Sequence, residues 1–124
     1  MNVEVPKKRL DAPAILSAFG RLTRRGITPK TGQTFRWDGQ GHIQSCCAIG
    51  AVVLDMSNCQ VIPRYQTYLQ DLGYTVSNLA GVAAGFDGLQ SMSRVTPDYQ
   101  AGWAVGRQVR QHLIQSGFMD DSPE

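Results

Sequence analysis

The chain has 124 residues, of which 42% are apolar and 18% are charged, which fits one domain with its own core and excludes a chain that is disordered throughout. Its longest apolar run, residues 46–54, is far shorter than the roughly 20 residues of a membrane helix, and MNVEVPKKRL lacks the apolar segment of a secretory signal. Because three cysteines also suit reduced thiols better than a disulfide framework, we expect a soluble, cytoplasmic protein with no membrane partner.

The formal net charge of +2 is distributed unevenly along the chain. Residues 1–36 carry eight basic and two acidic side chains, whereas residues 37–124 carry four basic and eight acidic ones. This asymmetry indicates either an acidic partner for the first part or self-association of opposite ends, which leaves a homo-oligomer open. A solvated surface with a chance imbalance is the alternative.

The first helix is expected over residues 11–25. Asp11 is a typical N-cap, and the apolar residues Ile15, Phe19 and Leu22 share one face at helical spacing. Gly26 then supplies a residue suited to the left-handed conformation in which helices end.

The next segment predicts a small β-hairpin arm. Phe35 and Trp37 alternate with polar residues, and Asp38-Gly39 is a pair typical of a turn. An isolated hairpin is only marginally stable, so we expect its aromatic side chains to dock on helices.

A second helix is expected from Ser45, as N-cap, to about Ser57, with Asn58 in the left-handed position after it. Its residues are apolar almost all round, which is typical of a central, buried helix.

Three more helices follow, each with a start and a stop signal. The first covers about 63–72, the second is short and begins after Ser77, and the last opens at Thr96-Pro97-Asp98. In the last helix Gly102 and Gly106 are four residues apart, which allows another element to approach closely.

The expected fold is therefore mainly α (α+β), with about five helices packed around the central buried helix and a small β-hairpin arm. We expect a flexible N-terminus at 1–10, a single compact domain at 11–118 and an acidic tail at 119–124.

This layout resembles a loose class of small uncharacterised bacterial and phage proteins. They share an N-terminal helix, an aromatic residue after a turn, a CCxxG-type run that opens a buried helix, and a C-terminal helix; here Trp37 and CCAIGA (residues 46–51) fall in that order. The resemblance implies a compact domain and gives no reaction.

A second, local resemblance concerns QGHIQSCCAIGAV, residues 40–52. It is similar to the active-site helix of papain-type cysteine peptidases, in which Gln-Gly precedes Ser-Cys-Trp-Ala by three variable residues. The resemblance implies Cys46 as nucleophile and Gln40 as an oxyanion-hole donor. A thiol at a helix N-terminus has a lowered pKa, and the free N–H groups there stabilise an oxyanion.

The rest of the papain-type pattern is missing. Cys47 stands where the family has Trp, and the chain is much shorter than the family. His42 reaches Cys46 as a base only through a favourable turn, and His112 lies in an expected helix. The alternative is that Cys46 and Cys47 are small buried residues at a helix start.

The sequence predicts neither a metal site nor a cofactor. Adjacent cysteines chelate one ion poorly, and no C-x-x-C or H-x-x-x-H spacing is present. No glycine-rich phosphate-binding motif occurs either.

The basic residues give the favoured functional hypothesis. Arginines gather at the end of the first helix, more basic residues follow, and an aromatic side chain is interleaved, as in proteins that hold single-stranded nucleic acid. We therefore expect a small binding protein, such as a phage-related modulator or inhibitor, that contacts an acidic protein or nucleic acid; the alternative is a Cys46-dependent acyl-transfer enzyme. The expected partner-binding residues are Arg21, Arg24, Arg25, Lys30, Arg36 and Trp37.

Overall fold

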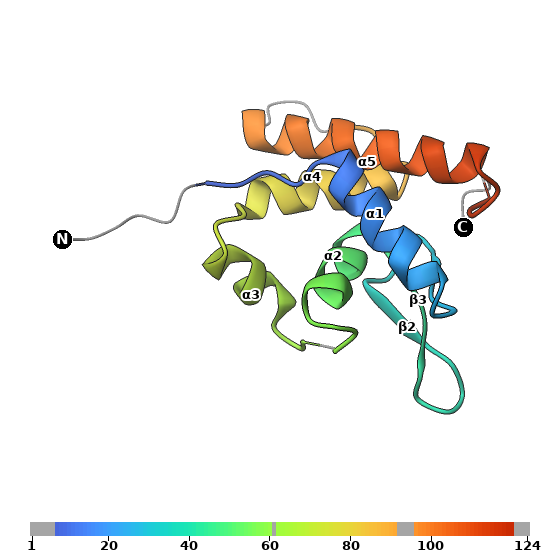
Figure 1. The fold of residues 1–124 in the computed structure, drawn as a ribbon. Coiled ribbons are helices and arrows are strands. Elements are labelled where there is room, and N and C mark those ends of the chain that lie inside the picture. Colours follow the sequence, from blue (N-terminus) through green and yellow to red (C-terminus); the bar gives the residue numbers. More distant parts are fainter. Residues whose placement is uncertain (1–6, 61, 92–95, 121–124) are drawn as a thin grey trace.

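The computed structural model describes residues 7–60, 62–91 and 96–120. It is mainly α with a small β part, which confirms the expected fold class (Figure 1). The elements in chain order are α1 (Ala12–Thr23), β1 (Thr28–Pro29), β2 (Phe35–Trp37), β3 (Ile43–Cys46), α2 (Ala48–Met56), α3 (Tyr65–Asp71), α4 (Val76–Phe86) and α5 (Pro97–Gln115).

Helices α4 and α5 pack backbone against backbone through four glycines. A Cβ atom built on Gly102 or Gly106 of α5 would collide with a carbonyl oxygen of α4, and one built on Gly81 or Gly85 of α4 would collide with a carbonyl oxygen of α5. The close approach is thus reciprocal over two turns of each helix. Of these glycines, Gly102 and Gly106 were expected from the sequence to allow such an approach.

Helices α1 and α2 pack on this pair and enclose the core. All residues of α2 from Ala48 to Leu54 are buried, which confirms the central helix expected from its composition. Helix α1 crosses the assembly (Figure 1), and its Phe19 stacks on Phe86 of α4 with ring centroids 5.8 Å apart. The core therefore lies where α1, α2 and the α4–α5 pair meet.

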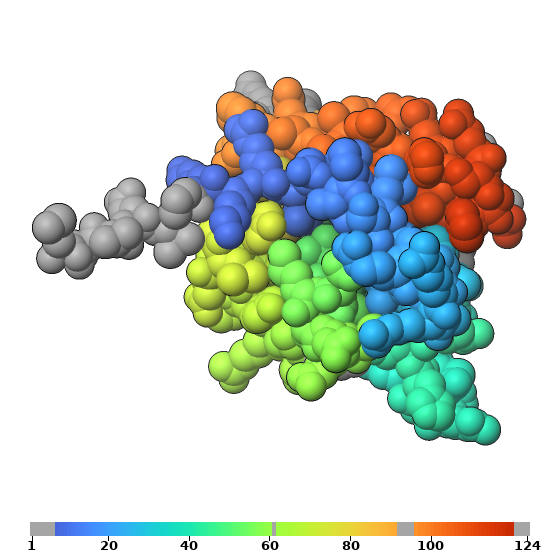
Figure 2. Space-filling model, in the orientation of Figure 1, coloured from blue at the N-terminus to red at the C-terminus, as the bar shows by residue number. Residues whose placement is uncertain are grey.

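The arm is part of a three-stranded sheet with the order β1-β3-β2. The central strand β3 is antiparallel to β2, as expected for a hairpin, and parallel to the two-residue strand β1. Figure 2 shows the arm, in turquoise, standing out from the body of the molecule. Strand β1 was not anticipated, because two residues carry no periodicity.

Asp11 and Thr96 cap α1 and α5 as expected, whereas the starts of α2, α3 and α4 differ from the sequence expectation. Helix α3 begins at Tyr65 rather than at about residue 63. Ser45 lies in β3, so the N-cap of α2 is Cys47 rather than Ser45. Helix α4 begins earlier than expected, because the Thr75 side chain accepts the Asn78 N–H at 3.2 Å and makes Thr75 the cap in place of Ser77.

The ends of the chain were expected to be a flexible N-terminus and an acidic tail. Residues 1–6 and 121–124 lie outside the described residues. Residues 7–10 reach the body: the Lys8 N–H donates to the Gly73 carbonyl at 2.8 Å, and Leu10 is buried. The fully buried side chain of Asn78 accepts the Leu10 N–H at 2.9 Å and donates to the Asp98 carbonyl at 3.1 Å. Asn78 thus joins the N-terminal segment to α4 and α5.

Replacing Gly102 with alanine will destabilise the fold, because the new methyl group meets the carbonyl of Asn78. Overpacking of this kind costs about 1–3 kcal/mol of unfolding free energy, measured by urea denaturation. Gly20→Ala is the matched control, since a Cβ atom on this exposed residue of α1 has nothing within 4 Å. It will gain roughly 0.5–1 kcal/mol from helix propensity. Equal stability of Gly102→Ala and the unaltered chain would contradict the close packing.

Candidate functional site

The two cysteines singled out in the sequence occupy different structural positions. Cys46 is the last residue of β3, and Cys47 caps α2, so the helix begins two residues later than expected from a Ser45 cap, and Cys46 lies before it. Cys46 is 1% exposed, and its burial raises the pKa of its thiol far above the usual range, with smaller contributions in the same direction from Cys47 and Cys59. The Cys46 thiol is therefore protonated at neutral pH and closed to a substrate.

The other two residues of the papain-type set lie at the tip of the arm. The Asp38 carboxylate accepts the backbone N–H groups of Gln40 at 2.8 Å and His42 at 3.0 Å, and these bonds lower the pKa of Asp38. The His42 side chain is 76% exposed and lies 3.8 Å from Asp38. His42 comes just before β3 and Cys46 is its last residue, so the strand, at about 3.3 Å per residue, separates the two. The arrangement does not bring Cys46, His42 and Gln40 together as a catalytic set.

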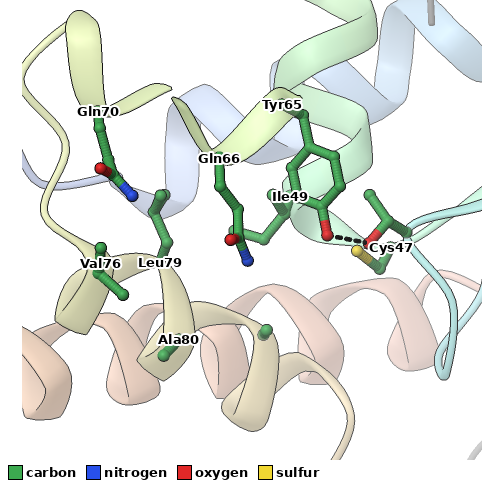
Figure 3. Close-up of a pocket in the computed structure, with 10 residues that line it drawn as sticks. Cys47, Ile49, Tyr65, Gln66, Gln70, Val76, Leu79 and Ala80 are labelled. Atoms are coloured by element: carbon green, nitrogen blue, oxygen red, sulfur yellow. Dashed lines mark hydrogen bonds between the residues drawn. The ribbon is translucent and has the colours of Figure 1, made fainter. Parts of the chain in front are cut away.

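Cys47, which the sequence reasoning did not favour, lines a pocket of about 110 Å³ between the arm, α2, α3 and α4. Figure 3 shows Cys47 and Tyr65 among the residues that line it, and the Tyr65 hydroxyl accepts a hydrogen bond from the Thr34 hydroxyl at 3.0 Å. Burial raises the pKa of the Cys47 thiol, while the N–H groups of Gly50 and Ile49 act in the opposite direction without forming a capping hydrogen bond. The pocket joins four segments that are separate in sequence, so no local pattern predicts it.

The arginines of α1 were expected to form a basic face, and two of them have partners within the protein. Arg21 donates to both carboxylate oxygens of Asp55, at 2.6 and 2.8 Å, and this carboxylate raises the pKa of Arg21. Arg25 donates to the side chains of Asn58 and Cys59, at 3.2 and 3.1 Å. Arg24 is exposed at the C-terminal end of the helix. The Asp55 carboxylate thus partly offsets the charge of Arg21, whose side chain stays 57% exposed.

The arm carries the other expected partner-binding residues. Phe35 is buried in the core and meets the Tyr65 ring edge-on, with centroids 5.9 Å apart, as expected for a docked aromatic. Trp37 is 49% exposed, contrary to that expectation. Arg36 lies between them, is exposed, and belongs to the edge strand of the sheet. We call Lys30, Arg36 and Trp37 the arm surface.

No group of three or more His, Cys, Asp or Glu side chains within residues 7–60, 62–91 and 96–120 is placed to hold a metal ion. None of the helices described is both long and apolar enough to cross a membrane. No protein-family model, curated protein or solved structure matches the chain. Both resemblances therefore stay predictions, and function must be argued from the residues.

Iodoacetamide at neutral pH will label Cys59 before the other two thiols. Cys59 is partly exposed, whereas Cys46 and Cys47 are buried with raised pKa values, so we expect them to react only when the protein unfolds. Mass spectrometry of tryptic peptides measures the three rates, and Cys59→Ser is the control that should abolish native labelling. Rapid labelling of Cys46 in the folded protein would contradict its burial and restore the acyl-transfer hypothesis.

Proposed function

We propose that this chain is a small binding protein that contacts an acidic partner through the arm surface. The observation that carries the proposal is the half-exposed indole of Trp37. Its neighbour Phe35 anchors the strand in the core, so Trp37 is held on a supported element rather than on a free loop. A rigid aromatic side chain beside cationic ones is a common basis of recognition.

Of the two classes of acidic partner, single-stranded nucleic acid is favoured. An exposed indole provides a face on which a base stacks, and neighbouring Lys and Arg side chains attract the phosphate backbone. Arg36 adjoins Trp37 in β2, and Lys30 follows β1 in the same sheet, where its N–H donates to the Cys46 carbonyl at 2.9 Å. An acidic protein would use the same charges but gains less from a stacking surface.

The structure also redefines which basic residues support this proposal. Arg21 pairs with Asp55 near the end of α2, and Arg25 bonds to Asn58 in the turn after it. Both therefore contribute less to the proposed partner contact than the sequence suggested. Arg24 is exposed and remains in the proposed contact region with the arm surface. A role as modulator or inhibitor of a phage or host factor is the proposed biological setting of such binding.

Trp37→Ala and Arg36→Glu will each weaken binding of a fluorescein-labelled oligodeoxythymidylate, measured by fluorescence anisotropy. Loss of one base stack costs about 1–3 kcal/mol. Loss of one phosphate contact lowers the magnitude of the slope of log K against log salt by about 1.

Two variants on other parts of the surface serve as matched controls for that experiment. Arg107→Glu makes the same charge change on α5, and Phe118→Ala removes a ring that is 52% exposed after α5. Neither should alter the affinity beyond the general effect of net charge. Equal losses in Arg107→Glu and Arg36→Glu would mean non-specific attraction, and tight binding of polyglutamate but not of the oligonucleotide would identify an acidic protein as partner instead.

A further inference from the structure

A polar pocket of about 290 Å³ lies beside the arm surface and encloses an unpaired buried hydroxyl group. Ser45 is 3% exposed, and its Oγ atom has no hydrogen-bond partner in the structure. A buried hydroxyl normally donates and accepts hydrogen bonds, so leaving it unpaired costs free energy. The residues that line the pocket are Lys30, Thr31, Gly32, Gln33, Arg36 and Ser45.

The sheet register explains why Ser45 faces this pocket. In the central strand Ser45 pairs with Arg36 of β2 on one side and with Thr28 of β1 on the other. Directly paired residues project from the same face of a sheet. Arg36 and Thr28 are exposed, so Ser45 belongs to the solvent-side row even though its neighbours cover it. Its hydroxyl group thus lies beneath a cationic side chain rather than in the apolar core.

The other lining residues add donors and no carboxylate. Lys30 contributes an ammonium group, and Thr31 and Gln33 are polar. The Gly32 N–H donates to the Asp87 carboxylate at 3.2 Å, but Asp87 itself does not line the pocket. The pocket thus offers the cationic groups of Lys30 and Arg36 and the unpaired hydroxyl of Ser45. Such a set suits an anion with several acceptor oxygens, because hydrogen bonds between charged groups are stronger than those between neutral ones.

We propose that this pocket binds a phosphate group, which accepts hydrogen bonds from the Ser45 hydroxyl, the Arg36 guanidinium and the Lys30 ammonium groups. A phosphate offers more acceptor oxygens than a carboxylate, so it can accept hydrogen bonds from groups on all three residues at once. The proposal rests on the proposed function and deepens it: a strand with a base on Trp37 would cross the edge strand β2, and one of its backbone phosphates would enter the pocket on the Arg36 side. A free phosphate or a phosphate monoester is the other source of the same chemistry.

The first test measures thermal unfolding of the full chain while inorganic phosphate replaces chloride at constant ionic strength. Ligand that binds the folded state raises the midpoint, so the midpoint of the unaltered chain should rise with phosphate. In Ser45→Ala the rise should disappear, while the midpoint in chloride stays the same or increases because the unpaired hydroxyl group is gone. Ser17→Ala, at an exposed residue of α1, is the control and should keep the full rise. The same rise in Ser45→Ala and the unaltered chain, or no rise in either, would overturn the proposal.

A second measurement separates the two sources of phosphate from a failure of the proposed function. Ser45→Ala should weaken oligodeoxythymidylate binding several-fold, and an oligonucleotide with an uncharged methylphosphonate backbone should show no dependence on Ser45. If phosphate raises the midpoint through Ser45 but no strand binds, the phosphate site stands with a free phosphate or a monoester, and the proposed function fails. If strand binding depends on Trp37 but not on Ser45, the proposed function stands and the phosphate site is refuted.

Discussion

The close contact between the backbones of α4 and α5 is the constraint on which the rest of the fold depends. Glycines on both helices remove the side chains that would keep the two backbones apart, so the pair forms a thin platform. Thin packing leaves room on one side for Phe19 of α1 and for the wholly apolar α2. Asn78, buried at the start of the platform, satisfies polar groups of the N-terminal segment and of α5. Asn78 therefore lies where the two helix backbones are in close contact and where buried polar groups find hydrogen-bond partners.

The buried α2 in turn determines what the arm exposes. Strand β3 leads directly into this helix, so Cys46 at its end and Cys47 at the cap of α2 enter the core. The Thr34 carbonyl accepts the Cys47 N–H at 3.2 Å. Phe35, on the apolar side of β2, is buried in the same core. The opposite side of the sheet then keeps the residues that the core does not use, and these are cationic and polar. The burial of the cysteines and the exposure of the arm surface therefore arise from one arrangement, and the proposed binding role uses the exposed side.

Local signals predicted the helices well, and non-local contacts account for what was missed. The caps at Asp11 and Thr96, the left-handed Asn58 and the glycine pair of α5 all follow from residue type and spacing. Ser45 resembles a helix cap locally, yet pairing with β1 and β2 extends the strand through it. The ion pair of Arg21 with Asp55 joins residues 34 positions apart. The pocket at Cys47 is lined by residues from several elements. No sequence spacing indicates either feature.

The central claim is that Trp37 and its cationic neighbours contact a phosphate-bearing strand. The chain has two tryptophans, and Trp103 on α5 donates its indole N–H to the Leu89 carbonyl, away from the arm. The most direct measurement is the emission of Trp37 in a Trp103→Phe variant during titration with single-stranded oligodeoxythymidylate. Our account predicts quenching that saturates at low salt and is reversed as salt rises. Binding of the oligonucleotide with unchanged Trp37 emission, or the absence of binding at low salt, would contradict it.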